Sequence, residues 1–372
     1  MVQSSRLVLC PPTLPEGEWR REVHIVTQTE FITELTESEW LGMGATEVRQ
    51  VFVPPSYQTP KGTLFKARNL CFWQEESGVG EDCDEKRSWV LSLDEEAVIQ
   101  RSLVESFIKD VLEDEEESRI GFALSPALFD LTSGQIPILV KIMESRCVAW
   151  SHMLMTARAS EPEGALFFHG GAFFVRASVD RQLGNDWGPK ASVAEDFATG
   201  VVAREKKIPF KFLKGWFVEG TTPTLGGYFA HYARILRGQL YTLHCLPMSE
   251  EQRILYGRRI FLAATYPLTQ MFFLLFQILA PASFLPAGPA CAILDVIFVY
   301  TAAARATAFV FGATYMEMSK WEIIAYMLLS PVIIFIVAPV TDSIIVLKTI
   351  LIMANEWRNG STTFEVTVKP SK

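Results

Sequence analysis

A long segment without charge places the strongest limit on how this chain can fold. From Ile260 to Leu294 it contains no Asp, Glu, Lys or Arg. A helix that crosses a lipid bilayer needs about 20 mostly apolar residues. The segment therefore predicts membrane helices, and we expect spans near residues 260–280 and 290–311.

A third apolar run, residues 321–353, contains two prolines and is expected to be broken or re-entrant. Arg253, Arg258 and Arg259 precede the first span, and positively charged residues favour the cytosolic side of a membrane. We therefore expect an integral, multi-pass membrane protein whose polar N-terminal part is cytosolic; the Golgi, the ER and the plasma membrane are all open as its location.

Charge and cysteine content exclude two classes of protein. The formal net charge of −8 argues against a nucleic-acid partner, because phosphate backbones attract basic surfaces. The six cysteines form no C-x-x-C pair and read as reduced thiols rather than as a disulfide framework or a zinc site.

The polar part of the chain predicts an α/β domain. Runs at residues 22–27, 48–53, 89–93 and 120–124 have the short apolar or alternating pattern of strands. An amphipathic pattern over residues 102–112 predicts a helix. Residues 1–22 contain several prolines and read as an irregular lead-in.

A predicted strand ends in three acids, Asp94, Glu95 and Glu96. Such a cluster at the end of a buried strand is costly unless something cationic meets it. Asp94 and Glu96 are two residues apart, which in extended backbone points both carboxylates the same way. Two hard oxygen ligands suit Mg²⁺ or Mn²⁺. The alternative is a solvated acidic turn.

A basic cluster lies upstream of this strand, where a helix is expected to begin near Thr63. Lys66, Arg68 and Asn69 fall in its first turns, after a glycine at position 62. Cations beside the N–H groups of a helix start form an anion site. A basic surface helix is the other interpretation.

Two further segments carry polar residues of interest. His169, Gly170 and Gly171 form a small-residue loop that lets backbone approach a ligand, although a single histidine is more often structural. Downstream, Ser192 and Glu195 have the spacing of a capping box at a helix start. That role leaves the neighbouring Asp196 unexplained.

Taken together, three spaced segments resemble the membrane-bound family 2 glycosyltransferases, and most closely the egghead-type β-1,4-mannosyltransferases. They are residues 57–70, 89–96 and 192–196, and the similarity runs from about Val23 to the C-terminus. The resemblance implies an α/β, GT-A-like (Rossmann-like) domain that lacks its first strand–helix unit, followed by a helical transmembrane region. The implied divisions are a lead-in (1–22), the catalytic domain (23–240), an interfacial segment (241–259), the transmembrane region (260–357) and a cytosolic tail (358–372).

The resemblance also implies roles for individual residues. Asp94 and Glu96 would hold a divalent cation, Mn²⁺ or Mg²⁺, on the donor diphosphate. Asp196 would be the general base that takes a proton from the acceptor hydroxyl. The remaining implied contacts are to the nucleotide for Lys66, Arg68 and Asn69, and to the acceptor or diphosphate for His169, Gly170, Gly171, Glu195, His231 and Arg234.

Two features are similar to the processive polysaccharide synthases. Phe364, Thr367 and Lys369 fit an F-x-V-T-x-K gating element. The segment from His231 to Ile235 falls where that family has Q-x-x-R-W, and Ile235 cannot stack on a sugar as tryptophan would.

The function that the resemblance implies is inverting transfer of a sugar, mannose in the most similar relatives, from a GDP- or UDP-sugar to a hydroxyl in β linkage. Expected partners are the nucleotide sugar, a glycan or glycolipid acceptor, the lipid bilayer and further subunits of a membrane homo- or hetero-oligomer. The alternative is a truncated or degenerate, non-catalytic membrane homologue that acts as a partner of a polysaccharide synthase.

Overall fold

The computed structural model describes the chain in segments: residues 4–10, 20–27, 47–76, 84, 86–94, 97–113, 120–125, 127–130, 136–144, 170–279, 319–321, 323–324, 328, 332 and 336–360. The chain divides into two compact units. The first comprises residues 1–127, 154–219 and 238–252, and the second comprises residues 128–153, 220–237 and 253–372.

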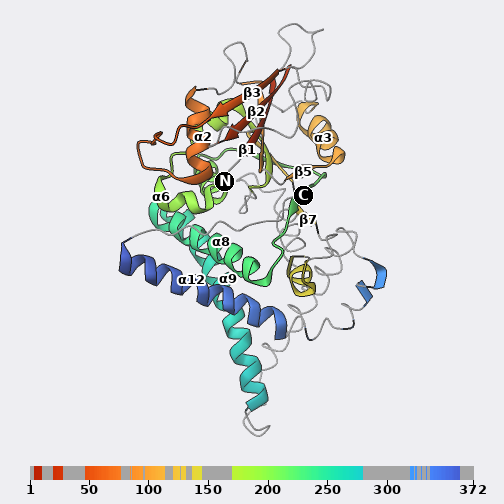
Figure 1. The fold of residues 1–372 in the computed structure, drawn as a ribbon, viewed down its shortest axis with the longest axis vertical. Helices are drawn as coiled ribbons and strands as arrows, with labels where there is room; N and C mark the ends of the chain where they lie inside the picture. Colours follow the sequence, from red (N-terminus) through yellow and green to blue (C-terminus); the bar gives the residue numbers. More distant parts are fainter. Residues whose placement is uncertain are drawn as a thin grey trace. The chain divides into compact units, whose positions relative to one another are not determined.

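A mixed seven-stranded sheet forms the centre of the first unit (Figure 1). Its strand order is β3-β2-β1-β4-β8-β6-β9. β1 and β8 run antiparallel to their neighbours, whereas β2 pairs with β3, and β6 with β9, in parallel. The strands are β1 (Ser4–Cys10), β2 (Arg20–Thr27), β3 (Glu47–Phe52), β4 (Trp89–Asp94), β6 (Phe122–Leu124), β8 (Ala172–Arg176) and β9 (Phe210–Phe212).

Residues 1–22 differ from the predicted irregular lead-in. β1 lies between β2 and β4, with Val8 opposite Val90 and Leu7 opposite Leu91, and β2 begins at Arg20. The physical reason is the apolar run Leu7 to Leu9, which can occupy an interior place in the sheet despite the prolines that follow.

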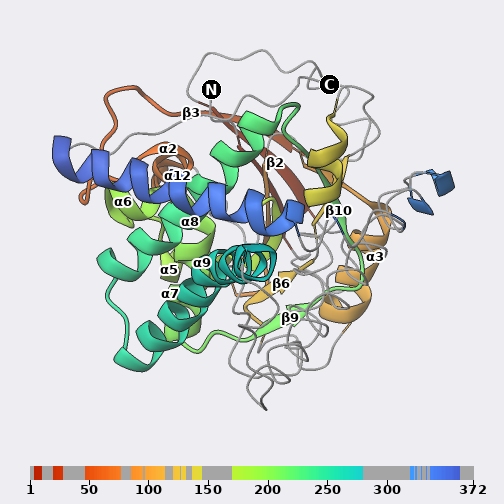
Figure 2. The ribbon, with the colours of Figure 1, turned by 90° about the horizontal axis from the view of Figure 1, so that it is seen from below.

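The strand β4 is apolar without alternation because both of its faces are covered. Val90 packs in one cluster with Trp73 of α2 (Phe65–Glu76). Leu91 packs in another with Phe107 of α3 (Arg101–Phe107). Figures 1 and 2 show α2 and α3 on opposite sides of the sheet. A strand that is buried on both faces reads as a continuous apolar run.

Buried polar contacts hold α2 on the sheet. The indole N–H of Trp73 donates a hydrogen bond to Nδ1 of His24 on β2, at 2.8 Å. The other ring nitrogen, Nε2, lies 3.0 Å from Oε2 of Glu22. All three side chains are almost fully buried. Because buried polar groups are costly unless they are paired, this network fixes the position of α2.

The helices α5 (Ala177–Leu183), α6 (Gly188–Ala191) and α7 (Glu195–Glu205) complete the first unit after β8. The expected helix over 102–112 is α3, followed by a π-helical turn over Ile108–Leu112. Two short strands, β5 (Val98–Ile99) and β10 (Phe217–Gly220), pair antiparallel.

The second unit is mainly helical. Residues 138–144 are helical, and Val140 and Met143 pack with Tyr228 and Ile345 in an apolar cluster. Arg237 and Glu356 form a buried ion pair at 2.8 Å. The unit also contains most of β7 (Ala127–Asp130), much of α8 (Leu225–Cys245) and α9 (Glu250–Leu279), and all of α12 (Ala338–Asn359).

The predicted membrane spans meet the described residues only in part. α9 covers the first, residues 290–311 lie outside the described segments, and α12 begins at Ala338 within the third. Among the helices that the structure describes, none is both long enough and apolar enough to cross a membrane.

Candidate active site

Asp94 stands where β4 leaves the sheet. The N–H of Asp94 donates to the carbonyl of Gly171 at 2.9 Å, and its own carbonyl accepts from Ala97 at 3.0 Å, which closes a turn. Its side chain is 27% exposed, so the carboxylate lies at the accessible end of an otherwise buried strand. The apolar run of β4 is therefore what places this carboxylate at the sheet end.

Lys66, the second residue of α2, meets the carboxylate of Asp94. Its Nζ donates a hydrogen bond to Oδ1 of Asp94 and lies 3.4 Å from the carbonyl oxygen of Gly170. Oε1 of Glu195 is 3.6 Å away. Burial alone would lower the pKa of Lys66, but the carboxylates of Asp94, Glu195 and Asp196 outweigh it and raise the pKa. The ammonium is thus kept charged by the acids around it.

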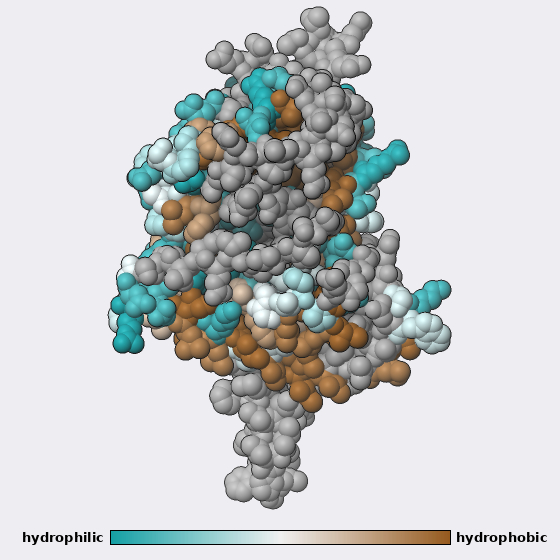
Figure 3. Space-filling view, viewed as in Figure 1, coloured by the Kyte–Doolittle hydropathy of each residue, from teal (hydrophilic) through white to brown (hydrophobic). Residues whose placement is uncertain are grey.

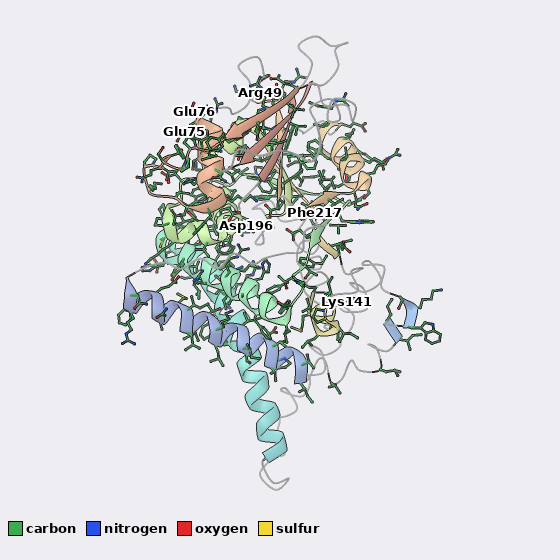
Figure 4. The ribbon with its side chains drawn as sticks, viewed as in Figure 1. Arg49, Glu75, Glu76, Lys141, Asp196 and Phe217 are labelled. Atoms are coloured by element: carbon green, nitrogen blue, oxygen red, sulfur yellow. The ribbon has the colours of Figure 1, made fainter. Side chains whose placement is uncertain are left out.

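Asp196 lies in the first turn of α7 (Figure 4). Its Oδ1 accepts a hydrogen bond of 2.7 Å from the N–H of Phe197. Gly170 packs directly on this side chain: a Cβ added there would lie 2.7 Å from Cβ and 2.9 Å from Oδ2 of Asp196. Any larger residue at position 170 would displace the carboxylate, which explains the glycine.

The adjacent Gly171 faces a different acid. A Cβ at this position would collide with Oε1 of Glu219 and would lie 2.6 Å from the ring of Phe217, both on β10. Glu219 is buried. No motif in the sequence indicates this carboxylate, although an acid directly after the strand-like run 211–218 was a usable signal.

The predicted capping box at α7 is wrong. Ser192 belongs to a 3-10 turn over Ser192–Ala194, and α7 starts at Glu195 without a side-chain cap. The Ser192 hydroxyl instead donates to the carbonyl of Gly188 at 2.5 Å and accepts from the N–H of Leu64 at 3.1 Å. Glu195 is consequently available to face Lys66.

The structure brings four of the predicted site residues together: Lys66, Asp94, Glu195 and Asp196, with Gly170 against them. Asn69 is buried one turn after Lys66. Arg68 lies roughly 200° around α2 from Lys66, because each residue of a helix turns by about 100°. Its buried Nε has no hydrogen-bond partner among the described residues.

Other predicted residues fall elsewhere. His231 and Arg234 lie on the part of α8 that belongs to the second unit, where the His231 ring meets Tyr232 edge to face. The remaining predicted residues lie outside the described segments: Glu96, His169, Phe364, Thr367 and Lys369.

Asp186 is a second residue near the site that no sequence motif indicates. Its carboxylate accepts hydrogen bonds from the hydroxyls of Thr59 and Thr63, at 2.7 and 2.5 Å, and from the N–H of Lys61 at 3.0 Å. Burial would raise the pKa of Asp186, but these hydrogen bonds outweigh it and lower the pKa. No local pattern predicts this cluster, because Asp186 lies more than 120 residues from each of its three partners in sequence.

Among the described residues, Asp94 is the carboxylate that could help to hold a divalent cation shared with a phosphate ligand. Within the described part of the chain, no three His, Cys, Asp or Glu side chains form a metal-binding group. Mg²⁺ is usually bound by one or two carboxylates together with substrate phosphates and waters, rather than by a protein cage. Asp94, partly exposed beside the Lys66 ammonium, fits that mode of binding.

Comparison with known proteins agrees with this arrangement. The family model described as "Glycosyl transferase family group 2" matches residues 89–338. The β-1,4-mannosyltransferase egh of Drosophila melanogaster is 26% identical over 279 residues, which cover 71% of this chain and 55% of the relative. The β-1,4-mannosyltransferase bre-3 of Caenorhabditis elegans is 26% identical over 225 residues, covering 60% of this chain and 48% of the relative.

The chain spans about half the length of these curated relatives. The family match itself covers residues 89–338, well over half of the chain, and includes β4, Asp94 and Asp196. The α/β architecture with a mixed sheet is also what that family implies. The chain belongs to glycosyl transferase family group 2.

Proposed function

We propose that this protein is an inverting, metal-dependent glycosyltransferase. It would move a sugar from a GDP- or UDP-sugar to a hydroxyl of a glycan or lipid-linked acceptor, in β linkage. The observation that carries the proposal is the meeting of Lys66, Asp94 and Asp196 at one end of the sheet. A cation, an oxygen ligand and a base are the groups that displacement of a sugar diphosphate requires.

The proposed roles follow from the chemistry of each group. The acceptor oxygen forms a bond to the anomeric carbon, the bond from that carbon to the diphosphate breaks, and the acceptor proton passes to the carboxylate of Asp196. Lys66 places its ammonium beside the departing diphosphate. When bound, Mn²⁺ or Mg²⁺ held by Asp94, with Glu96 as its predicted partner, would stabilise the charge on the diphosphate.

Asp196 is well placed to act as a base. It lies at the N-terminal end of α7, where the helix dipole favours a negative charge, and the N–H of Phe197 holds one carboxylate oxygen. Gly170 keeps the backbone of the neighbouring loop against the carboxylate. The second oxygen, Oδ2, is the atom that we assign to accept the proton.

The identity of the sugar is proposed from the relatives. Both egh and bre-3 are described as β-1,4-mannosyltransferases, so mannose from a GDP donor is the first candidate. A glycan or glycolipid hydroxyl would be the acceptor.

Release of nucleoside diphosphate from GDP-mannose and from UDP-sugars, with Mn²⁺ or Mg²⁺ present, tests the proposal. We expect turnover by the full chain, and losses of about 10²-fold or more in Asp94→Asn and Asp196→Asn, because one removes a metal ligand and the other the base. Asp84→Asn is the matched control, since the Asp84 side chain accepts a hydrogen bond from the N–H of Lys86 in an exposed turn.

Full turnover by Asp196→Asn would overturn the assignment of the base. A folded protein without turnover on any of these donors would instead favour the non-catalytic partner subunit that the substitution of Ile235 for tryptophan suggests.

We also propose that α12 contacts a lipid bilayer. Its buried side carries polar groups, among them Thr341, Ser343 and Thr349, whereas Ile344, Leu347 and Ile350 on its exposed side are apolar. Leu351 is 70% exposed and Trp357 is 90% exposed. Figure 3 shows the hydrophobic surface over this helix. Apolar groups outside and polar groups inside suit a hydrocarbon environment better than water.

Association with phospholipid vesicles tests this proposal. Leu351→Glu should weaken co-flotation of the full chain with phosphatidylcholine vesicles, because it places a charge on the apolar face. Asn355→Glu adds the same charge on the exposed surface of the same helix, where a polar group already stands, and should weaken it less. Equal flotation of both variants and the wild type would contradict the proposal.

A further inference from the structure

Asp186 joins two segments that each lead into the candidate site. One is the loop from Thr59 to Thr63, which precedes α2 and Lys66. The other is the segment from Asp186 to Ser192, which precedes α7 with Glu195 and Asp196. All of these residues belong to the first unit.

Several further hydrogen bonds support the link between the two segments. Beside its bonds to Asp186, Thr63 accepts from the N–H of Gly188 through its hydroxyl at 2.7 Å, and its own N–H donates to the hydroxyl of Thr59 at 2.7 Å. The N–H of Leu64 donates to the hydroxyl of Ser192 at 3.1 Å. Each segment therefore holds the other at several points.

The loop needs this support because its backbone is strained. Phe65, the residue directly before Lys66, has a φ of 57°, which is unfavourable for a bulky side chain. Gly62 and Gly188 also have positive φ, at 69° and 80°, but glycine adopts such angles without cost. A strained residue persists only where its surroundings fix it. Two of the contacts, from Thr63 to Asp186 and from Leu64 to Ser192, lie within two residues of Phe65 and can do so.

We propose that Asp186 is a positioning residue: by tying the loop before α2 to the segment before α7, it sets Lys66 against Asp94 and Glu195 in the geometry that sugar transfer needs. This inference rests on the proposed transferase function. Asp186 itself touches neither Lys66 nor Asp94 in the contacts described above, and it acts through Thr63 and the backbone of residues 64–66.

Asp186→Asn keeps the shape of the side chain but removes its charge and one acceptor oxygen. We expect kcat to fall roughly tenfold to a hundredfold, because a small misplacement of a catalytic group has effects of that size. KM for the donor should change less than kcat, and the melting temperature at pH 7 should fall only modestly. Thr63→Val should behave like Asp186→Asn, and Thr63→Ser should stay near the wild type. The double variant that combines Thr63→Val with Asp186→Asn should be no worse than either single one.

Hydrogen–deuterium exchange gives a readout that does not depend on activity. In Asp186→Asn we expect faster exchange in peptides that cover residues 59–69 and 186–197, and unchanged exchange in β8. The control Asp84→Asn changes an aspartate whose side chain accepts a backbone hydrogen bond in an exposed turn, and it should alter neither exchange in these peptides nor turnover.

The outcomes separate this inference from the proposed function. If the wild type turns over no donor, the proposed function fails, and the exchange data still decide whether Asp186 fixes the residues around Lys66 and Glu195. If the wild type is active but Asp186→Asn keeps its kcat, or if exchange quickens only at residue 186 itself, Asp186 has no positioning role. A uniform rise in exchange would mark a general structural role and would also overturn the inference.

Discussion

At the scale of single residues, the site depends on glycine as well as on charged side chains, because glycine leaves space for a neighbouring carboxylate. Gly170 leaves room for the carboxylate of Asp196, and a Cβ added there would lie 2.7 to 3.0 Å from its atoms. Contacts shorter than 3.0 Å force one of the two groups to move. Because Asp196 is held at the start of α7, the movement would fall on its side chain or on the loop at Gly170.

We therefore expect Gly170→Ala to lower kcat at least about tenfold, since it displaces the proposed base, with only a modest loss of stability. Steady-state kinetics and thermal unfolding of the purified protein would measure the two effects. Gly257→Ala is the matched control: it makes the same chemical change on α9, where an added Cβ meets nothing within 4 Å. Unchanged kinetics in Gly170→Ala would show that the carboxylate can move without consequence.

A second residue-scale prediction concerns pH. Burial would raise the pKa of Asp186, but the hydrogen bonds from Thr63, Thr59 and the N–H of Lys61 outweigh it and lower the pKa. A carboxyl group with a lower pKa in the folded state contributes stability above its unfolded pKa, which is about 3.9. That contribution is lost as the pH falls through the folded value.

The wild type should therefore unfold at a higher temperature than Asp186→Asn at pH 7, and the gap should narrow as the pH falls from about 5 towards 3. Thermal unfolding followed by circular dichroism at each pH would measure it. A gap of constant size over this range would mean that the charge of Asp186 contributes nothing.

Sequence alone could indicate Asp94 but not Asp186. Asp94 directly follows an apolar run of the kind that forms a buried strand. The local sequence pattern therefore predicts that Asp94 lies at the end of a strand. Asp186 acts through Thr59 and Thr63, and only the folded chain brings these residues together. Ser192 is a similar case. Its spacing to Glu195 predicts a helix cap, but its hydroxyl instead accepts a hydrogen bond from the N–H of Leu64, which is distant in sequence.

At the scale of elements, the predicted strands of the first unit lie close to their observed positions. Their apolar runs are long enough to mark β2, β3 and β4. The sequence pattern does not predict β1, because its apolar run, Leu7 to Leu9, is short and Pro11 and Pro12 follow the strand directly. Pairing with β2 and β4 supplies the stabilisation that its own sequence does not reveal.

Within the second unit, α8 and α12 are joined by the ion pair of Arg237 and Glu356. Both side chains are less than 5% exposed. Removing one partner leaves the other charge buried, which typically costs about 3–5 kcal/mol. We therefore expect Glu356→Ala to destabilise the protein by an amount of that order, measured by denaturant unfolding in detergent.

The matched control for this pair replaces both partners. Arg237→Met combined with Glu356→Leu leaves no charge behind and should cost much less than Glu356→Ala, since apolar side chains can replace a buried ion pair at little cost. A double variant as unstable as the single one would show that the pair is needed for more than its mutual neutralisation.

At the scale of the whole molecule, the two compact units interleave along the chain, whereas the predicted divisions are consecutive segments. Residues 128–153 and 220–237 join the second unit although the first unit continues on both sides of them in sequence. A hydropathy pattern describes residues that are neighbours in sequence. It therefore cannot show that a segment packs with a unit other than the one on either side of it in sequence. The apolar clusters that define each unit arise only from tertiary packing.

Ligand binding should stabilise the folded chain as a whole if the proposed site is correct. A ligand that binds only the folded state adds about 2.7 kcal/mol when its free concentration is about a hundred times its dissociation constant. We expect GDP or UDP with Mn²⁺ to raise the melting temperature of the full chain in a concentration-dependent way, and a chelator to reverse much of the rise. Asp94→Asn should abolish the part that requires Mn²⁺, because it removes the proposed ligand, whereas Asp84→Asn should retain it. An equal metal-dependent rise in Asp94→Asn and in the wild type would place the cation elsewhere.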